Sequence, residues 1–457
     1  MHEFSFRAGK FLSQLFLVSL CLGGKSKTMK SKLSVGLSLL LCASVFVQPV
    51  AAKTNDSYFA QFHPLPAPKI SGLILKPNDR LAICGDSITE QKMYSRIMET
   101  YLTVALPEFQ ISTQQYGWGG ERAPGFLTRM TNDVLRFKPT IATTCYGMND
   151  HEYRAYEQRI GDVYRSNQRA IVESFKNHGA RVVLGSSGCV GSKVPWAKTN
   201  SELMNLNLCQ LRNIDVEIAK KEKVRFADVF WPMLQIEFSA REKFGEDYHI
   251  AGKDGVHPGW AGHLVMAYAF LKSLGLDGEI GTFTINLKSN DADASKGHEV
   301  VSFKDGELKI KSSRYPFCAA GDPAKDDNIR SAMGLVPFNK DLNRLILVVK
   351  KGKAEKYKVT WGDETKTYTA EQLGRGVNLA DEFQINPFSE AFAKVDAAVA
   401  AKQAYETTQI KQAFRSPEAK ADMEAIAVKT EKEREPLVAA IKAAFVPVAH
   451  TIKISAE

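Results

Sequence analysis

From about residue 80 to residue 276, short apolar stretches alternate with longer segments whose apolar residues recur at helical spacing. The short stretches are rich in β-branched and aromatic residues and are bounded by Gly, Ser or Asp, which is typical of strands. They cover residues 80–86, 109–117, 140–147, 181–187 and 224–230. The helical segments between them cover 90–105, 123–137, 160–179 and 205–223. This alternation predicts an α/β fold with a parallel sheet covered by helices on both faces.

The pattern changes near Gly281. Strand-like stretches separated by turn residues predict an antiparallel β-rich unit over residues 282–380. Two helices rich in alanine and charged residues follow and predict a helical hairpin over 384–446, with Ser416 as the N-cap of the second. Residues 447–457 are expected to be a C-terminal tail.

The N-terminus has the features of a targeting segment. Starting at Met29, a possible alternative start, Lys30 and Lys32 precede an apolar run that ends at the small residues Val50 and Ala52. We expect residues 1–52 to be a signal region cleaved after Ala52, and the protein to be secreted or periplasmic, with residues 53–79 as a linker. An uncleaved membrane anchor is the alternative, but the apolar run is short for a membrane span.

Composition and charge narrow the possible functions. The 457 residues are 44% hydrophobic and 24% charged, which is ordinary for a globular protein. Loss of residues 1–52 removes six basic residues and one acidic residue, so the net charge falls from +9 to +4. The remaining lysines are dispersed, and we expect no nucleic-acid partner. No stable membrane insertion is expected after cleavage, and the oligomeric state is left open.

Five cysteines follow residue 52, at positions 84, 145, 189, 209 and 318. The odd number and the absence of CxxC spacing argue against a disulfide framework or a zinc site. Whether Cys189 and Cys209 pair is left open. No metal or cofactor is expected, because the histidines lack metal-ligand spacing.

Ser87 lies where the first predicted strand, "AICGD", runs into a helix. Ligands of parallel sheets bind at this carboxyl edge, and a nucleophile placed there is exposed and rigidly held. The alternative is that Ser87 or Thr89 only caps the helix.

Three further stretches place reactive groups at the same edge. "QYGWGGERA" follows the second strand and contains Gly119 and Gly120, whose backbone N–H groups can approach a substrate closely. "CYGMND" follows the third strand and contains Asn149, whose amide can donate to an oxyanion. "GKDGVHPGWAGH" contains Asp254 and His257, three residues apart, so the acid can hold the imidazole. Together they predict a serine hydrolase site.

The motifs "GDSIT", "GWGGE", "GMND" and "DGVHP" resemble the four blocks of the SGNH/GDSL hydrolase superfamily, in the family's order. The resemblance covers about residues 70–276. It implies a flavodoxin-like three-layer sandwich with a five-stranded parallel sheet, a catalytic domain over 80–278, and esterase activity.

Carried over to this sequence, the resemblance implies that Ser87 is the nucleophile, His257 the general base and Asp254 its orienting acid. The Ser87 N–H, Gly120 and Asn149 would form the oxyanion hole. The second block usually begins with Asn, whereas this chain has Gln115. The choice between Gly119 and Gly120 therefore stays open.

Aromatic and polar residues beside these blocks favour a carbohydrate ester, because aromatic faces next to hydrogen-bonding groups suit sugar rings. The candidate substrate-binding residues are Trp118, Glu121, Tyr146, Asp150 and Trp260. The expected reaction is removal of a small acyl group, such as acetyl, from carbohydrate. The alternatives are a lipid-directed esterase and a carbohydrate-binding protein with a non-catalytic hydrolase scaffold.

Overall fold

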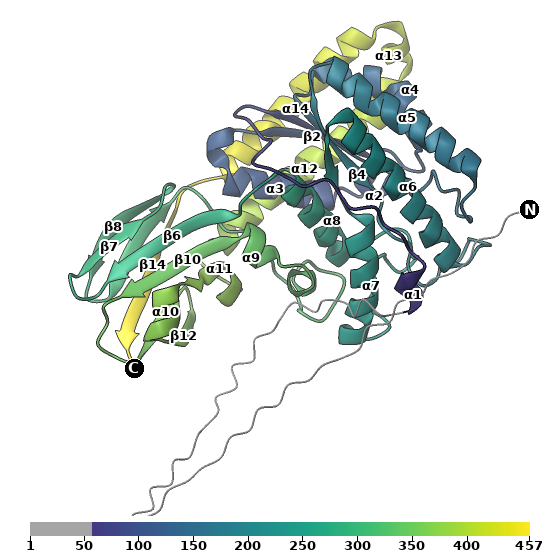
Figure 1. The fold of residues 1–457 in the computed structure, drawn as a ribbon. Coiled ribbons are helices and arrows are strands. Elements are labelled where there is room, and N and C mark those ends of the chain that lie inside the picture. Colours follow the sequence, from purple (N-terminus) through teal and green to yellow (C-terminus); the bar gives the residue numbers. More distant parts are fainter. Residues whose placement is uncertain (1–56) are drawn as a thin grey trace, which may run out of the picture. The chain divides into compact units, whose positions relative to one another are not determined.

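The computed structural model describes residues 57–457, so the signal region predicted over 1–52 lies outside the described residues. Five parallel strands form one sheet in the order β2-β1-β3-β4-β5 (Figure 1). The strands are β1 (Arg80–Gly85), β2 (Ser112–Gly117), β3 (Ile141–Tyr146), β4 (Arg181–Ser186) and β5 (Arg225–Ala227). The predicted flavodoxin-like sheet is confirmed, since this strand order is typical of that fold.

Helices cover both faces of the sheet because successive side chains of each strand point to opposite faces. Leu81 and Ile83 pack in one core cluster, whereas Ala82 and Cys84 pack in the other. The first face is covered by α3 (Tyr94–Ala105), α7 (Phe230–Phe244) and α8 (Trp260–Ser273). The second is covered by α4 (Ala123–Asp133), α5 (Gln158–Asn177) and α6 (Ser201–Glu222).

The helix predicted over 90–105 is divided in the structure. A single helical turn, α2 (Ser87–Glu90), precedes α3, and Lys92 between them has a φ of +58°. A non-glycine residue in this left-handed conformation interrupts a right-handed helix. Ser87 is therefore the first residue of a short turn rather than of a long helix.

The described part of the predicted linker, residues 57–79, is packed against the catalytic domain. In α1 (Ser57–Ala60), the Tyr58 ring lies 4.6 Å from that of Phe238 on α7. Further on, the Ile74 N–H donates to the carbonyl of Leu274, 2.9 Å away. These contacts fix the segment, unlike a free linker.

Beyond residue 278 the chain forms two further sheets, in the orders β13-β10-β6-β7 and β12-β11-β14-β9-β8. Their strands are β6 (Glu279–Asn286), β7 (Asp291–Ala294), β8 (His298–Lys304), β9 (Glu307–Ser312), β10 (Arg344–Lys350), β11 (Lys356–Trp361), β12 (Glu364–Thr369), β13 (Val377–Asn378) and β14 (Val448–Ala456). The expectation of a wholly antiparallel unit is wrong, because β10 pairs with β6 in parallel. The long connection from β9 to β10 allows this arrangement.

Short helices occupy the connections within these sheets: η3 (Ser331–Gly334), α9 (Phe338–Leu342), α10 (Ala370–Arg375) and α11 (Leu379–Glu382). Three 3₁₀ turns lie elsewhere: η1 (Pro107–Phe109) before β2, η2 (Leu135–Phe137) before β3, and η4 (Ala413–Arg415) after the first long helix of the C-terminal region.

The predicted helical hairpin is formed by α12 (Ser389–Lys411) and α14 (Met423–Ala444), with α13 (Pro417–Ala421) between them. In Figure 1 these yellow-green to yellow helices lie with the catalytic domain, where α12 packs on α3 and β2. The segment expected as a tail instead forms β14, between β11 and β9. His450, Ile452 and Ile454 alternate inward along it.

The hairpin covers the free edge of the catalytic sheet. The outward Thr113 carbonyl of edge strand β2 accepts hydrogen bonds from Lys402 Nζ at 2.6 Å and Arg434 Nη2 at 2.7 Å. The outward Gln115 N–H donates to Glu406 Oε2 at 3.0 Å. Side chains of α12 and α14 thus satisfy backbone groups that an edge strand otherwise leaves unpaired.

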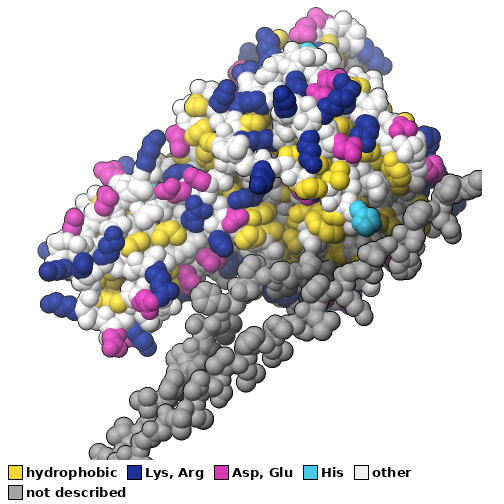
Figure 2. Space-filling view, in the orientation of Figure 1, with side chains coloured by type: hydrophobic (Ala, Val, Ile, Leu, Met, Phe, Trp, Pro, Cys, Tyr) yellow, Lys and Arg dark blue, Asp and Glu magenta, His cyan; other side chains and the backbone are white. Residues whose placement is uncertain are grey.

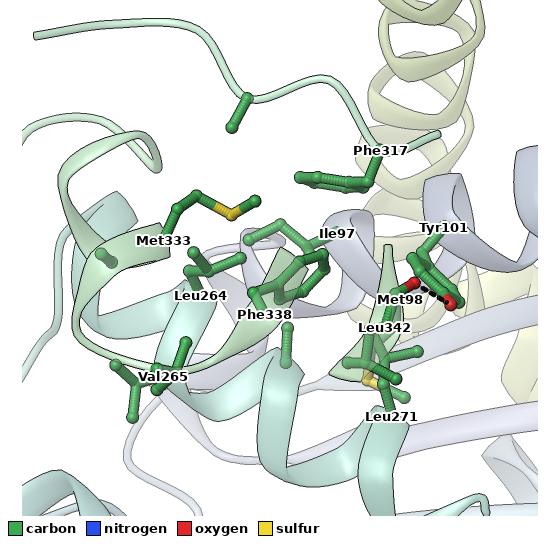
Figure 3. Packing of buried hydrophobic residues seen from close by; sticks show 14 of the residues in the cluster. Ile97, Met98, Tyr101, Leu264, Val265, Leu271, Phe317, Met333, Phe338 and Leu342 are labelled. Carbon is green, nitrogen blue, oxygen red and sulfur yellow. Dashed lines mark hydrogen bonds between the residues drawn. The ribbon is translucent and has the colours of Figure 1, made fainter. Parts of the chain in front are cut away.

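One apolar core joins the catalytic domain to the C-terminal extension (Figure 3). Residues of α3 and α8 pack there against Phe317, Met333, Phe338 and Leu342 of the extension. The Tyr101 hydroxyl on α3 donates to the Leu342 carbonyl, 2.6 Å away. The extension is therefore built into the same core as the catalytic sheet.

On the face drawn in Figure 2, Lys and Arg side chains are dispersed and mixed with Asp and Glu. Over residues 57–457, no helix combines the length and apolar character that a membrane crossing needs. The five cysteines of this part of the chain are buried and free, and Cys189 and Cys209 do not form a disulfide.

Candidate active site

Three predicted residues meet at the carboxyl edge of the catalytic sheet. Ser87 Oγ lies 2.8 Å from His257 Nε2, and His257 Nδ1 lies 2.7 Å from Asp254 Oδ2. The side chains of His257 and Asp254 are 34% and 38% exposed, so the group is open to a substrate. A hydroxyl, an imidazole and a carboxylate in this order form the hydrogen-bonded chain of a serine hydrolase triad.

Ser87 is placed by the turn that begins with it. The preceding residue, Asp86, caps the turn through a hydrogen bond from the Ile88 N–H to its Oδ1 at 2.9 Å. Asp86, rather than Ser87, is thus the N-cap, which leaves the Ser87 hydroxyl for His257. Burial, with added repulsion from Asp150 and Glu121, raises the pKa of Asp86 to about 7.

The loop that carries His257 is folded around Asp254. Asp254 Oδ1 accepts the N–H groups of Val256 at 2.9 Å and His257 at 2.8 Å, which leaves Oδ2 for the imidazole. Partial desolvation acts to raise the pKa of Asp254, but the hydrogen bonds from His257 and Val256 outweigh it and lower the pKa below its usual value. Asp254 is therefore kept ionised beside the imidazole.

In the loop between β2 and α4, the N–H groups of Trp118, Gly119 and Glu121 are paired. The Trp118 N–H donates to the Gly85 carbonyl at 3.0 Å, and the Glu121 N–H donates to Trp118. The Gly119 N–H donates to Glu90 Oε2. Within the described residues the Gly120 N–H has no such partner, and Gly120 has a φ of +71°. The geometry favours Gly120 over Gly119 as the oxyanion donor.

Asn149 lies beside this loop. Its Nδ2 donates to the Glu121 carbonyl at 3.1 Å and lies 3.4 Å from Asp86 Oδ2. Its Oδ1 accepts the Tyr153 hydroxyl at 3.2 Å, which fixes the amide with its N–H groups toward Asp86 and the glycine loop. Tyr153 was not among the residues predicted from sequence.

Three of the five candidate substrate-binding residues are buried and paired, so the expectation that they contact substrate is wrong. The Glu121 carboxylate binds Arg129 at 2.6 Å and accepts the Tyr146 hydroxyl at 2.8 Å. Asp150 accepts the N–H groups of Ala123 and Gly147 at 2.9 and 3.0 Å. These buried side chains stabilise the loops of the site through their hydrogen bonds and ion pair.

The two candidate tryptophans, Trp118 and Trp260, are partly exposed. The Trp118 ring has cations from α4, α12 and η4 around it, so it packs against the hairpin. Trp260, three residues after His257, lines a groove of about 340 Å³ together with Phe392 and Ile385 of the extension. Trp260 also has a cation on its ring, since Arg96 Cζ of α3 lies 5.5 Å from the ring centre, but it keeps a position in a groove.

Sequence reasoning missed an exposed aromatic side chain at this edge. Trp196, in the loop after β4, is 52% exposed, and its ring lies 6.2 Å from that of Tyr153 in an edge-on arrangement. The same loop packs against the Asp254 loop, since the Gly191 N–H donates to the Gly255 carbonyl at 2.9 Å. Its place after a strand, at the carboxyl edge, was the signal that could have identified it.

The histidines near the site have structural contacts. His263 is buried, accepts the Tyr94 N–H at 3.1 Å, and has its pKa lowered to about 3, mainly by burial. Burial likewise lowers the pKa of His151 to about 4. Across residues 57–457, no cluster of three or more His, Cys, Asp or Glu side chains is arranged to hold a metal ion.

Comparison with known proteins agrees with this geometry. Residues 83–265 match the model of the GDSL-like lipase/acylhydrolase family. No curated protein sequence matches the chain.

Solved structures are similar to this chain at low sequence identity. A gut microbial diltiazem-metabolizing enzyme is 22% identical, with a TM-score of 0.67 over 85% of this chain and 100% of its own. This likeness shows a shared fold that continues into the C-terminal extension. An acetylxylan esterase from Geobacillus stearothermophilus is 21% identical, with a TM-score of 0.37 over 44% of this chain and 96% of its own.

The matched segment contains every residue of the triad and of the expected oxyanion hole. It also contains all five strands of the parallel sheet, apart from the first residues of β1. Residues 83–265 therefore belong to the GDSL-like lipase/acylhydrolase family, and the chain is a carboxylic ester hydrolase of the SGNH type.

Proposed function

We propose that this enzyme removes small acyl groups, acetyl above all, from carbohydrate through an acyl-enzyme formed on Ser87. The observation that carries the catalytic assignment is the hydrogen-bonded chain from Ser87 through His257 to Asp254. His257 Nε2 takes the Ser87 proton as Oγ attacks the ester carbonyl. Asp254 holds the opposite ring nitrogen and stabilises the imidazolium that forms.

The tetrahedral intermediate then collapses. Its bond to the sugar oxygen breaks, and His257 gives the proton to that oxygen so that the alcohol leaves. In the second half, His257 takes a proton from water, which attacks the acyl carbon, and returns it to Ser87 as the carboxylic acid leaves. Over one cycle the Ser87 proton goes to the alcohol, a proton from water replaces it on Ser87, and the acyl group leaves as the carboxylic acid.

Negative charge on the carbonyl oxygen is met by three donors in each half. These are the N–H groups of Ser87 and Gly120 and the amide of Asn149. Asn149 gives up its longer contact, at 3.4 Å to Asp86 Oδ2, to reach the oxyanion, so little reorganisation is needed as charge develops.

The catalytic assignment is tested with Ser87→Ala. Ser87 is partly exposed, so its loss should leave the melting temperature nearly unchanged while removing almost all hydrolysis of 4-nitrophenyl acetate. A fluorophosphonate probe should label the wild type and not the variant. Hydrolysis at the wild-type rate by Ser87→Ala would refute the assignment.

Support for a carbohydrate substrate comes from the aromatic residues around the triad. Trp196 is half-exposed with its ring 6.2 Å from that of Tyr153, and Trp260, three residues after His257 in the chain, lines a groove with residues of the extension. Such faces suit sugar rings, whereas a long acyl chain needs an extended apolar channel. The enzyme should cleave 4-nitrophenyl acetate far better than the decanoate and release acetate from acetylated glycans. Preference for decanoate would favour the lipid-directed alternative.

We also propose export, on the basis of the signal-like sequence of residues 1–52. Full-length protein expressed in a bacterial host should be recovered from the periplasm or medium with Lys53 as its first residue. Recovery of the uncleaved chain in membranes would favour the anchor.

A further inference from the structure

Glu90 joins three parts of the molecule at the active site. It is the last residue of α2, the turn that begins with Ser87. Its Oε2 accepts the Gly119 N–H, and its Oε1 lies 2.6 Å from Lys411 Nζ. Lys411 is the last residue of α12, in the C-terminal hairpin. One carboxylate thus connects the nucleophile turn, the glycine loop and the extension.

The neighbouring Trp118 is held by the same hairpin. Lys411 Nζ lies 5.2 Å from the centre of the Trp118 ring, and Arg415 Cζ lies 5.0 Å from it. A third cation, Arg129 of α4, lies 5.2 Å away. Cations near a tryptophan ring attract it, so the residue before Gly119 is fixed from both sides.

Gln115, where the family usually has Asn, contributes to this arrangement. Its Oε1 accepts the Gly117 N–H at 3.0 Å, and its Nε2 donates to Thr407 Oγ1 of α12 at 2.6 Å. Its amide therefore bridges the start of the glycine loop and the extension. This contact gives the departure at Gln115 a physical role in docking α12.

Glycines need such anchors more than other residues do, because they have no side chain to restrict the backbone. Gly119 and Gly120 follow one another, and the N–H expected to meet the oxyanion belongs to the peptide that joins them. Holding the Gly119 N–H restricts the next peptide as well.

We propose that Lys411, at the end of α12 in the C-terminal hairpin, is a positioning residue which acts through Glu90 to aim the Gly120 N–H at the oxyanion. This inference rests on the proposed acyl-enzyme function. Lys411 keeps the Glu90 carboxylate over the Gly119 N–H; without it, the carboxylate is free to turn toward water.

The test compares Lys411→Met with the wild type on 4-nitrophenyl acetate. We expect kcat to fall about tenfold, part of the loss seen when an oxyanion donor is removed outright. KM should change less than about twofold, because the donor serves the transition state. The Lys411 and Glu90 side chains are 31% and 23% exposed, so the melting temperature should change little. Lys411→Arg should restore most of the kcat.

A matched control removes a contact of the same helix that does not reach the glycine loop. The Tyr405 hydroxyl of α12 binds the Thr430 carbonyl and Glu433 on α14, so Tyr405→Phe loosens the hairpin alone. It should keep the wild-type kcat. The rate at which a fluorophosphonate labels Ser87 should fall in Lys411→Met and not in Tyr405→Phe.

Glu90→Gln provides the second half of a double-mutant cycle. If Lys411 acts through Glu90, the double variant should be no slower than the slower single variant. Wild-type kcat in Lys411→Met, or equal losses in Lys411→Met and Tyr405→Phe, would overturn the proposal. Failure of the proposed function itself would appear instead as activity that survives Ser87→Ala.

Discussion

The hydroxyl of Tyr153 lies 3.2 Å from Asn149 Oδ1, and Tyr153 reaches it from an unusual backbone conformation. Glu152 and Tyr153 have φ values of +55° and +53°, in the left-handed region that large residues seldom adopt. Ion pairs from the Glu152 carboxylate to Arg159 and Arg122, at 2.7 and 3.1 Å, hold this turn. Strained backbone at this position serves to orient the Asn149 amide.

The first prediction concerns that orientation. Asn149→Ala should lower kcat by about 100- to 1000-fold, because it removes an oxyanion donor. Tyr153→Phe keeps the ring beside Trp196 but frees the amide to rotate, so we expect a smaller loss, about three- to tenfold. Steady-state kinetics on 4-nitrophenyl acetate measure both. An unchanged kcat in Asn149→Ala would remove that residue from the oxyanion hole.

The second prediction concerns the acid of the triad. In Asp254→Asn, an amide oxygen can still accept the backbone N–H groups of Val256 and His257, but the amide N–H₂ faces His257 Nδ1. This favours the wrong imidazole tautomer, and kcat should fall by about 10³- to 10⁴-fold. Circular dichroism should show the fold intact. A loss below tenfold would mean that another group orients His257.

Local patterns predicted the catalytic sheet well because each strand carries its own signal. Residues such as Leu81 and Ile83 alternate with Ala82 and Cys84, and both sets are buried, as in the central strands of a parallel sheet. The triad could be predicted for the same reason, since each of its members follows from a strand end or a short loop motif.

What escaped prediction depends on contacts between distant residues. The period-two pattern of His450, Ile452 and Ile454 was present, but its partners β9 and β11 lie about a hundred residues away or more. Glu121 and Tyr146 stood beside catalytic motifs, and no sequence pattern showed that Glu121 would bind Arg129 and Tyr146 inside the protein. Motif proximity therefore located the site but not which side chains face it.

The third prediction concerns the covered sheet edge. Lys402 is 1% exposed and lies 2.6 Å from Glu406 and 3.0 Å from Glu99. Lys402→Met leaves the buried Glu99 carboxylate without its cation, while Glu406 keeps Arg434 at 2.8 Å, and it should reduce the free energy of unfolding by about 3–5 kcal/mol. Urea denaturation measures this. Lys394→Met, on the exposed face of the same helix, breaks only a surface pair with Glu390 and should cost about 0.5 kcal/mol or less. Similar midpoints for the two variants would contradict the burial argument.

The effect of truncating the chain near residue 278 also depends on how the hairpin covers the sheet edge. A chain that ends there keeps all three residues of the triad, so the sequence motifs alone predict a competent active site. The contacts of Lys402, Gln115 and Lys411 indicate instead that removal of the hairpin exposes β2 and releases the glycine loop. The extension is thus both structural and close to the chemistry.

The fourth prediction concerns pH and a buried hydrogen-bond chain in the β-rich unit. The Trp361 indole N–H donates to His450 Nδ1 at 3.2 Å, so His450 Nε2 carries the hydrogen that Ser312 Oγ accepts at 2.9 Å. The Ser312 hydroxyl then donates to His298 Nδ1 at 2.8 Å, and His298 Nε2 donates to the Ile280 carbonyl. Each ring must be neutral for this chain to form.

Burial lowers the pKa of His450 to about 3, with a further contribution from His298. The unfolded chain therefore binds a proton near pH 6.5 that the folded protein does not bind, so stability is lost as the pH falls below that value. Between pH 7 and pH 5 the loss should be about 2 kcal/mol for His450. The side chain of the His450→Gln variant can still accept and donate hydrogen bonds. The free energy of unfolding of this variant should depend less on pH, by the equivalent of about one proton. A pH dependence of unfolding in His450→Gln equal to that of the wild type would contradict this assignment.

The last prediction concerns the substrate. Trp196 is half-exposed and edge-on to Tyr153, so it can contact the sugar without contacting the ester. Trp196→Ala should raise KM for an acetylated oligosaccharide about three- to tenfold, the effect of losing one aromatic contact. The kcat/KM for 4-nitrophenyl acetate should stay within about twofold, since that substrate has no sugar. Val163→Ala, an exposed apolar residue on α5, should change neither. Equal losses on both substrates would mean that Trp196 only supports the Asp254 loop, and improved cleavage of the decanoate would favour a lipid ester as the substrate.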